Sequence, residues 1–314
     1  MKLSIIIINW NTEDLLKDCL TSVYENAPLY PFEVIVVDNA SEDDSTKMVK
    51  RDFPSVFLIE NKKNLGFAAA NNVGIGASSG DYILLLNSDT IVHGAVLTAS
   101  LNYMDNTSSA GALGCKVLNE DGSLQHSTSQ FPSFLNLSIQ TLGLDRINGV
   151  KFFQRYRMQY SERKTAQAVE TISGCYLLAR RESFETIGLL DEDFFFFGEE
   201  TDWCKRLRSS DQEVHFAPIG TITHLGGGSS KSLNHRRDLM LTQATVRLHL
   251  KHSGWFTALF VFLLLWGFNL SRAVYWAFSN SIKPRNRTNK RMRHFIGVCR
   301  NFVKAWPKEK GVSL

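Results

Sequence analysis

The sequence predicts an α/β protein with a Rossmann-like, mostly parallel central sheet flanked by helices, followed by a helical extension at the C-terminus. Short β-branched runs alternate with segments of helical period over roughly the first hundred residues. Polar residues follow the ends of several of these runs. Beyond residue 252 the chain becomes apolar, aromatic and basic. We therefore expect two domains, at 1–252 and 253–314.

Strands and helices alternate regularly in the first part of the chain. Leu3–Ile8 is a continuous β-branched run, as expected of a parallel strand buried on both faces. Thr12 followed by two acids is typical of a helix start, and apolar residues then recur at helical spacing through Val23. The same reasoning predicts strands at 33–37, 56–60 and 82–86, a helix ending near Arg51, and a small-residue helix at 68–77.

The second part of the chain is less regular. Its predicted elements are strands at 112–117, 171–179, 213–217 and 221–224, a short helix at 181–187, and a segment of helical period at 239–252. Neither an internal repeat nor a low-complexity tract is present in the sequence.

Charge and cysteine content narrow the class of protein. The formal net charge is +4, but from Arg272 to the end the chain has 11 Lys and Arg and one acid, which leaves about −6 for the residues before it. The five cysteines are scattered and form no CxxC motif. This pattern argues for a reducing compartment and against a disulfide scaffold or a structural zinc site. The N-terminal run is too short for the core of a signal peptide.

The C-terminal region predicts membrane association. Trp255–Leu270 is a nearly continuous apolar run of 16 residues, whereas a transmembrane helix needs about 20. A helix lying in the membrane interface is therefore favoured, with Trp255, Trp266 and Tyr275 suited to the headgroup boundary. The basic segment 283–293 would attract anionic lipid. The alternative is a buried helix with a solvated tail, and we expect no nucleic-acid partner.

Polar residues at the predicted strand ends are the first candidates for a site. Ligands of open parallel sheets bind beyond the carboxyl ends of the strands, where Asn9, Asp38, Asn64 and Asp89 all lie. Asp89 could share a Mg²⁺ or Mn²⁺ ion with a substrate diphosphate. Asp38 could accept a hydrogen bond from a ribose or a pyrimidine. An Asx turn at Asp89 and a helix N-cap at Asp38 are the structural alternatives.

Two further segments could complete such a site. Gly66, in Asn64-Leu-Gly-Phe, would let a ligand approach the backbone closely, with Asn71 nearby, although a plain turn would also use glycine. His224 could complete a metal site, and the glycine-rich loop at 226–231 could cover a diphosphate. That loop is not a phosphate-binding P-loop, because GxxxxGK[ST] is absent. A structural role is the alternative for His224.

Three carboxylates follow an aromatic run at 194–197. Glu199, Glu200 and Asp202 repel one another, and an apolar border would raise the pKa of at least one, as a general base requires. The alternative is the first turn of a solvated helix, where acids complement the helix dipole.

The order of these motifs resembles that of family 2 glycosyltransferases with the GT-A fold, and most of all their bacterial rhamnosyltransferase-like branch. The resemblance covers residues 3–250 and follows the motifs in chain order: Asn9-Trp-Asn, Asp38-Asn-Ala-Ser, Asn64-Leu-Gly-Phe, Asn87-Ser-Asp, Gly174-Cys-Tyr and Gly198-Glu-Glu-Thr-Asp-Trp-Cys.

The resemblance implies inverting transfer of a sugar from a nucleotide-diphosphate donor to an acceptor hydroxyl. It implies that the donor is bound by Asn9, Trp10, Asp38, Asn64, Gly66, Asn71 and Ser88. It also implies that Asp89 is the last residue of the metal-binding Asp-x-Asp motif, whose first Asp is replaced here by Asn87, with His224 completing the Mg²⁺ or Mn²⁺ site. Glu200 matches the family's catalytic base, usually an Asp, and Glu199 or Asp202 are alternatives.

The same resemblance suggests a substrate and a location. The rhamnosyltransferase-like branch implies dTDP-L-rhamnose as donor and a lipid-linked glycan as acceptor. Such an enzyme would act at the cytoplasmic face of the bacterial inner membrane, in the synthesis of O-antigen or a similar surface polysaccharide. A non-catalytic nucleotide-sugar-binding module is the alternative. A nicotinamide oxidoreductase is rejected, because no G-x-G-x-x-G follows the first predicted strand.

Overall fold

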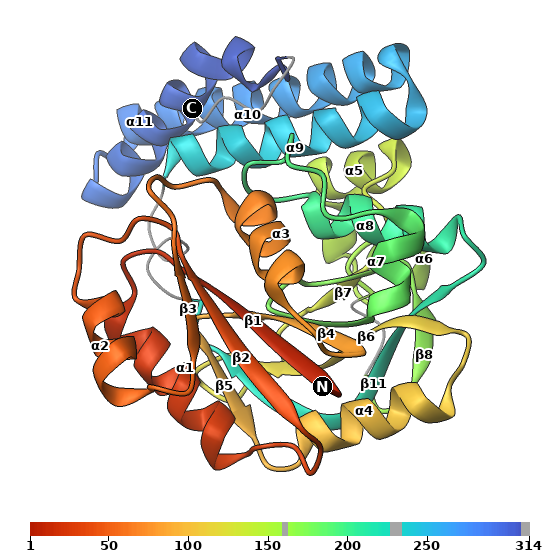
Figure 1. The fold of residues 1–314 in the computed structure, drawn as a ribbon. Coiled ribbons are helices and arrows are strands. Elements are labelled where there is room, and N and C mark those ends of the chain that lie inside the picture. The colour runs from red at the N-terminus through yellow and green to blue at the C-terminus, as the bar shows by residue number, and fades with distance from the viewer. Residues whose placement is uncertain (159–162, 227–233, 309–314) are drawn as a thin grey trace. The chain divides into compact units, whose positions relative to one another are not determined.

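The computed structural model describes residues 1–158, 163–226 and 234–308 (Figure 1). Two compact units make up the chain. The sheet unit comprises Met1–Phe131, Arg157–Glu192 and Glu199–Ser229. The helical unit comprises Pro132–Tyr156, Asp193–Gly198 and Ser230–Leu314.

This division differs from the predicted boundary at residue 252. The helix α9 (His235–Ser253), which precedes that boundary, belongs to the helical unit together with two shorter internal segments. The reason is packing: the apolar side of α9 is covered by α10 (Trp255–Ile282), with Val246 against Ala258 and Val261. A linear boundary cannot describe a unit assembled from three separate segments.

The sheet unit is built on a nine-stranded sheet with the order β3-β2-β1-β4-β10-β6-β11-β5, and β8 pairs with β11 outside this path. Its first four strands in this order are parallel, as the β-branched runs predict. The bounds are β1 (Leu3–Asn9), β2 (Phe32–Asp38), β3 (Phe57–Glu60), β4 (Tyr82–Asn87), β5 (Thr90–His93), β6 (Ala110–Leu118), β8 (Gln167–Val169), β10 (Tyr176–Arg180) and β11 (Glu213–His224).

Helices cover both faces of the sheet (Figure 1). Alternate strand residues divide between them: Ile5 and Ile7 pack on one side of β1 and Ile6 on the other. One face carries α1 (Glu13–Glu25), α2 (Ser45–Asp52) and α4 (Val96–Asn106). The other carries α3 (Phe67–Ala77), α7 (Arg181–Ile187) and α8 (Glu199–Arg208).

The second part of the sheet departs from the predicted elements at two places. The strand predicted at 171–179 is two strands, because the chain leaves a small sheet formed by β7 (Thr128–Ser129) and β9 (Thr171–Ile172) before it enters the large one as β10. The two strands predicted at 213–217 and 221–224 are one, β11, whose pairing with β6 shifts register between Phe216 and Thr221. The prediction missed β5, β7 and β8.

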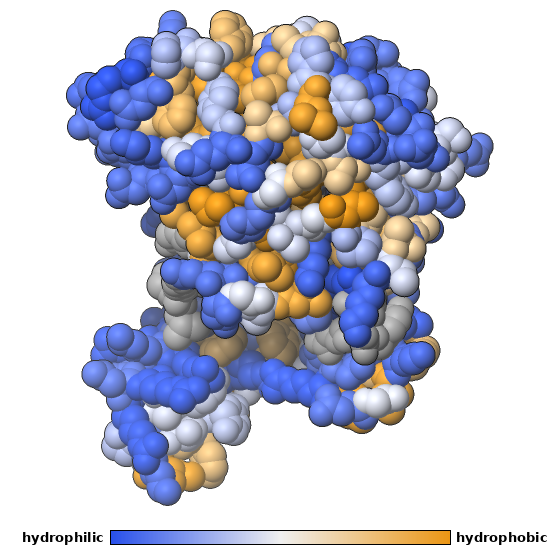
Figure 2. All heavy atoms as spheres, turned by 90° about the horizontal axis from the view of Figure 1, so that it is seen from below, coloured by the Kyte–Doolittle hydropathy of each residue, from blue (hydrophilic) through white to orange (hydrophobic). Residues whose placement is uncertain are grey.

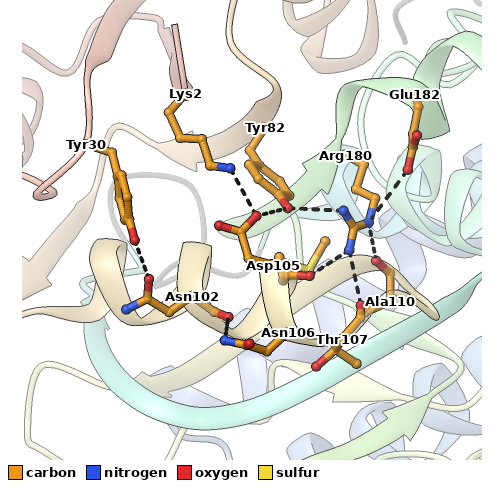
Figure 3. Close-up of polar contacts among 11 residues, drawn as sticks. Lys2, Tyr30, Tyr82, Asn102, Asp105, Asn106, Thr107, Ala110, Arg180 and Glu182 are labelled. Carbon is orange, nitrogen blue, oxygen red and sulfur yellow. Dashed lines mark hydrogen bonds and ion pairs between the residues drawn. The ribbon is translucent and has the colours of Figure 1, made fainter.

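A polar network at the amino end of β4 fixes α4 against the sheet (Figure 3). Arg180 donates hydrogen bonds to the carbonyls of Met104, at 2.6 Å, and Thr107, at 3.2 Å, which lie at the C-terminal end of α4. A cation at this position satisfies carbonyls that have no partner within the helix. Asp105 on the same helix accepts from Lys2 and Tyr82. We assign this network to stability.

The helical unit packs α9 and α11 (Asn286–Asn301) against α10, and the 3-10 turn Phe302–Ala305 follows α11. His294 of α11 lies 2.8 Å from the Asp238 carboxylate of α9. Its remaining helices are α5 (Phe134–Thr141), the short α6 (Lys151–Gln154) and the 3-10 turn Leu144–Arg146.

The face of the molecule seen from below mixes hydrophilic and hydrophobic side chains (Figure 2). Scattered apolar side chains are normal on protein surfaces and need no functional explanation.

Candidate active site

The ends of β1 and β2 form a buried polar junction. Asn9 and Asp38 are register partners in the parallel pair, so both side chains emerge at the same edge of the sheet. Asn9 donates to Asp38 Oδ1 at 2.8 Å, and the backbone NH of Ser41 donates to Asp38 Oδ2 at 2.9 Å. With 2% of its surface exposed, Asp38 stabilises the loop after β2 from within. Asp38 does not cap the following helix, because the N-cap residue of α2 is Asp44, so the helix N-cap alternative for Asp38 is wrong.

The loops after β1 and β2 are tied together and leave one aromatic ring exposed. Asn11 (φ 54°) and Ala40 (φ 63°) take left-handed backbone conformations there. The Asn11 side chain accepts from the backbone NH of Glu42 at 2.7 Å, which joins the two loops. Trp10, next to Asn11, is 55% exposed. Its ring is therefore available to stack on a planar ligand at the carboxyl edge of the sheet.

The Asn64–Asn71 segment is held by local bonds. Asn64 Oδ1 accepts from the backbone NH of Gly66 at 2.9 Å, and Gly66, at φ 84°, is the N-cap residue of α3. Asn71 is buried and donates to the Phe67 carbonyl one turn earlier. The structure thus places Asn64 and Gly66 in a tight turn beside the β2 loop. The Asn39 side chain joins the two segments by donating to the Gly66 carbonyl.

Asp89 and His224 come together through strand pairing. Asp89 lies in the turn between β4 and β5, and β5 pairs with β11 so that Thr90 faces His224. His224 Nε2 lies 3.1 Å from Asp89 Oδ1 and 3.3 Å from Asn87 Nδ2. Two residues 135 positions apart therefore present a nitrogen and a carboxylate to the same point.

The orientation of His224 is set by Gln125. Nδ1 of His224 lies 2.8 Å from Gln125 Oε1, and Gln125 Nε2 in turn donates to Asn119 Oδ1 at 2.8 Å. The amide oxygen of Gln125 can only accept, so Nδ1 carries the proton. In the neutral ring the lone pair is then on Nε2, facing the Asp89 carboxylate. Two acceptors at 3.1 Å need a proton or a cation between them.

These residues fit a hard divalent cation. Asn87 Oδ1 is buried beside them and has no hydrogen-bond partner among the described residues. Asp89, His224 and Asn87 would offer two oxygens and one nitrogen, and a Mg²⁺ or Mn²⁺ ion normally takes its remaining ligands from water and substrate phosphates. The described part of the chain contains no cluster of three or more His, Cys, Asp or Glu that could hold a metal unaided.

The three carboxylates at the start of α8 have different surroundings. Glu199 is 4% exposed and shares a side-chain hydrogen bond with Glu200. Burial, and then the charge of Glu200, raise the pKa of Glu199 well above its ordinary value. Asp202 is fully buried and accepts from Arg206 Nε at 2.8 Å.

The contacts of Arg206 indicate a structural role for Asp202. Arg206 also donates to the carbonyls of Ile187 and Leu189, at 2.6 and 2.7 Å, so the ion pair anchors α8 to the end of α7. The Glu199–Glu200 pair remains as the candidate for proton transfer; the carboxylates do lie in the first turn of a helix, but Glu199 and Asp202 are buried, so the solvated alternative is wrong for them.

Contacts and charges connect these groups at one edge of the sheet. Thr12 donates to Asn9 Oδ1 at 2.6 Å and lies 3.1 Å from Ser88 Oγ, which joins the end of β1 to the Asp89 turn. The pKa of the buried Cys175 thiol is raised to about 12, first by burial and then by the charges of Asp89 and Glu200, against the lowering effect of a Ser173 hydrogen bond.

Comparison with known proteins assigns the family. The model of glycosyl transferase family 2 matches residues 4–188, which is more than half of the chain. The chain belongs to glycosyl transferase family 2. As a family 2 glycosyltransferase it is an enzyme, and the predicted resemblance is confirmed. Glu199, Glu200 and His224 lie beyond the matched segment, so their assignment depends on the geometry described above.

Two of the similar proteins are rhamnosyltransferases. The chain is 27% identical over 248 residues to an N-acetylglucosaminyl-diphospho-decaprenol L-rhamnosyltransferase of Mycobacterium tuberculosis, covering 73% of this chain and 78% of the relative. It is 24% identical over 237 residues to rhamnosyltransferase WbbL of Escherichia coli, covering 73% of this chain and 85% of WbbL.

Solved structures support the GT-A fold. Residues 1–349 of Staphylococcus aureus TarS align with a TM-score of 0.53 at 16% identity, covering 98% of this chain and 81% of that one. GalNAc-T7, solved with UDP, GalNAc and Mn²⁺, aligns with a TM-score of 0.59 at 14% identity, covering 98% of this chain and 58% of that one. At such identities the likeness establishes the fold alone, and it confirms the predicted GT-A architecture.

The structure also shows site residues that sequence reasoning missed. Gln125 was not predicted, because it acts through a partner distant in the chain and lies outside the motifs. Asn39 lies in the Asp38-Asn-Ala-Ser motif, but its bond to the Gly66 carbonyl could not be inferred from the sequence. Asn87 was predicted only as the replacement for the first Asp of the Asp-x-Asp motif, and its own side-chain oxygen was not predicted as a metal ligand. Of the glycine-rich segment 226–231, residues 227–231 lie outside the described residues.

Proposed function

We propose that this family 2 glycosyltransferase moves a sugar, with inversion, from a nucleotide-diphosphate donor to a hydroxyl of a lipid-linked glycan. The observation that carries the proposal is the pairing of His224 Nε2 with Asp89 Oδ1 at 3.1 Å beside Asn87, an arrangement that suits a metal-bound diphosphate. The Glu199–Glu200 pair at the start of α8, in which Glu199 is buried, suits proton transfer.

The donor site is proposed at the carboxyl ends of β1, β2 and β4. Trp10 offers an exposed ring for the nucleobase, and the Asn9–Asp38 junction holds the loops that would contact the ribose. Asn64, Gly66, Asn71 and Ser88 support the same region through the contacts described above. Asp89, His224 and Asn87 would hold Mg²⁺ or Mn²⁺. That cation, when bound, would stabilise the negative charge that develops on the departing diphosphate.

Glu200 is proposed as the general base. It would take the proton of the acceptor hydroxyl while the hydroxyl oxygen bonds to the anomeric carbon and the bond from that carbon to the diphosphate oxygen breaks. Glu199 shares a side-chain hydrogen bond with Glu200, and burial and the charge of Glu200 raise the pKa of Glu199 well above its ordinary value, so a proton held by the pair favours Glu199. A positioned base of this kind contributes roughly 10²–10⁴-fold to the rate.

The names of the relatives support a finer assignment. Two are rhamnosyltransferases, and the mycobacterial one is named for a polyprenyl diphosphate acceptor. We therefore propose dTDP-L-rhamnose as donor and a polyprenyl-diphosphate-linked glycan as acceptor, in the synthesis of a bacterial surface polysaccharide. The cytoplasmic face of the inner membrane is the proposed location, since nucleotide sugars are cytoplasmic and the acceptor is a membrane lipid.

Transfer can be tested with the purified chain, a panel of nucleotide sugars and an N-acetylglucosaminyl-diphospho-polyprenol acceptor, with and without Mn²⁺. We expect release of nucleoside diphosphate with dTDP-L-rhamnose and a product whose anomeric configuration, read by NMR, is inverted. Donor binding without turnover for every sugar would instead support a nucleotide-sugar-binding module. Retained configuration would reject the mechanism.

The base assignment is tested by Glu200→Gln, which keeps the shape of the side chain but cannot take a proton. We expect transfer to fall by roughly 10²-fold or more while donor affinity is kept. Glu185→Gln, on the exposed side of α7, is the matched control and should transfer normally. Near-normal turnover in Glu200→Gln would exclude this residue as the base.

A further inference from the structure

The helix α10 of the helical unit carries an unusual exposed surface. Among the described residues it is long and apolar enough to cross a membrane, and only 22% of its most apolar window is buried. Six exposed side chains recur at intervals of three, four or seven residues and so lie on one face. We call them the apolar stripe: Phe256, Phe260, Leu263, Leu270, Val274 and Phe278.

The opposite face of α10 is occupied. Ala258 and Val261 pack against Val246 of α9, and Phe262 and Leu265 pack against a cluster that contains Val298 of α11. Both neighbours are charged helices: α9 contains Arg236, Arg237, Asp238 and Arg247, and α11 contains Arg287, Lys290, Arg291 and Arg293. If α10 crossed a bilayer, these side chains would enter hydrocarbon, where charges are strongly disfavoured.

The charge of the helical unit indicates which kind of surface binds the apolar stripe. The helical unit has 19 Lys and Arg residues and four Asp and Glu residues, which gives a formal charge of +15. The sheet unit has 16 Lys and Arg residues and 27 Asp and Glu residues, which gives a formal charge of −11. Arg272 and Arg291 stack on Phe268 and Trp276 of α10, so cations accompany its aromatic rings. An exposed apolar face within a strongly basic unit is complementary to an anionic lipid surface.

We propose that the apolar stripe inserts into the interface of an anionic bilayer with α10 lying in the membrane plane, so that the helical unit is monotopic. The inference deepens the proposed function, because an acceptor held in the same bilayer would reach the enzyme by lateral diffusion. Vesicle binding is measured without donor or acceptor. Absence of binding would therefore contradict the membrane proposal without contradicting the proposed transfer reaction.

Flotation with vesicles tests the stripe. We expect the full chain to bind vesicles that contain phosphatidylglycerol more tightly than vesicles of phosphatidylcholine alone, and to lose that difference near 1 M salt, where the Debye length is about 3 Å. The double variant Phe256→Gln/Phe278→Gln should bind about tenfold or more weakly. The double variant Leu29→Gln/Phe57→Gln removes two equally exposed apolar side chains from the sheet unit and should bind normally.

A labelling experiment separates an in-plane helix from a span. In a Cys299→Ser background, which leaves only buried native cysteines, one new cysteine replaces Ser253 or Asn286, which lie beyond the two ends of α10. With protein added to preformed vesicles, an impermeant thiol reagent outside should label both positions. Protection of one end would show a span and overturn the proposal, as would equal binding of the two double variants. Dimerisation that depends on the stripe, without vesicle binding, would assign the stripe to a second copy of the chain.

Discussion

At the scale of single residues, Gln125 is the side chain whose role is most open to test. It accepts from His224 Nδ1 and thereby directs the Nε2 lone pair at Asp89. Gln125→Ala should raise the metal concentration needed for half-maximal activity by roughly 10–100-fold, as loss of a residue that orients a metal ligand typically does. A Mn²⁺ titration of the transfer rate measures this.

The control for Gln125 is Gln140→Ala in α5 of the helical unit, which removes a glutamine with no role in the site. Its Mn²⁺ titration should match that of the unaltered enzyme. If the Mn²⁺ titration of Gln125→Ala also matched that of the unaltered enzyme, Gln125 would not be needed to orient His224 toward the metal.

Glu199 predicts an unusual dependence of stability on pH. Because burial raises its pKa in the folded protein, the folded state holds this proton more tightly than the unfolded chain, whose pKa is near 4.5. The stability due to Glu199 is therefore present below pH 4.5 and is lost as pH rises through the folded pKa. Glu199→Gln removes this loss, so its Tm relative to the parent should increase with pH above 4.5.

Thermal unfolding of both proteins across pH 4.5–8 measures the effect, with Glu185→Gln as a control for an exposed glutamate. Parallel Tm curves for the parent and Glu199→Gln would show that Glu199 is ionised in the folded protein.

The site residues show which assignments sequence can support. Asp89 and His224 were predicted together from a family resemblance, and the β5–β11 pairing supplies the geometry. Gln125 could not be predicted, because its role depends on a contact across 99 positions. Asp202 was indistinguishable from its neighbours in sequence, and only its ion pair with Arg206 and its complete burial separate it from them.

At the scale of elements, the close approach of α3 to β1 depends on one glycine. A Cβ on Gly74 would lie 2.5 Å from Ile6 Cγ2 and 3.3 Å from a Val37 methyl, both buried in the sheet. Gly74→Ala should therefore destabilise the fold by about 1–3 kcal/mol through overpacking. Gly76 lies on the same helix with open space around it. Gly76→Ala should be stabilising by about 0.5–1 kcal/mol.

Urea unfolding of the two alanine variants gives this comparison directly. Since both changes add one methyl group to α3, a difference in sign isolates packing against the sheet from helix propensity. Equal effects of the two changes would show that α3 can move away from β1 without cost.

Elements were predictable where local pattern and tertiary position agree. The apolar runs of β1, β2 and β4 are buried on both faces, so their composition alone identifies them. β5 was missed because Thr90–His93 is short and follows the Asp89 turn directly, with its strand character supplied by β11. The break between β9 and β10 was missed for a related reason: the chain changes sheets within an apolar stretch.

At the scale of the whole molecule, the chain separates two kinds of surface. Polar groups for a nucleotide sugar belong to the sheet unit, and the apolar stripe and most of the positive charge belong to the helical unit. Because helices α9 to α11 follow the sheet in sequence, their distinct composition was predictable. The inclusion of Pro132–Tyr156 and Asp193–Gly198 in the helical unit was not, since those segments interrupt the sheet unit and are recruited by packing.

This separation predicts that membrane docking and chemistry can be uncoupled. The stripe variant Phe256→Gln/Phe278→Gln should keep its kcat/KM for a short-chain acceptor that is soluble in water. For a long-chain acceptor in phosphatidylglycerol vesicles it should lose roughly tenfold or more, because less enzyme is bound at the surface where the acceptor lies. Initial rates with the two acceptors measure the ratio, and Leu29→Gln/Phe57→Gln should leave it unchanged. An equal loss with both acceptors would mean that the stripe supports the catalytic fold itself, since a docking surface has no means of slowing transfer to a soluble acceptor.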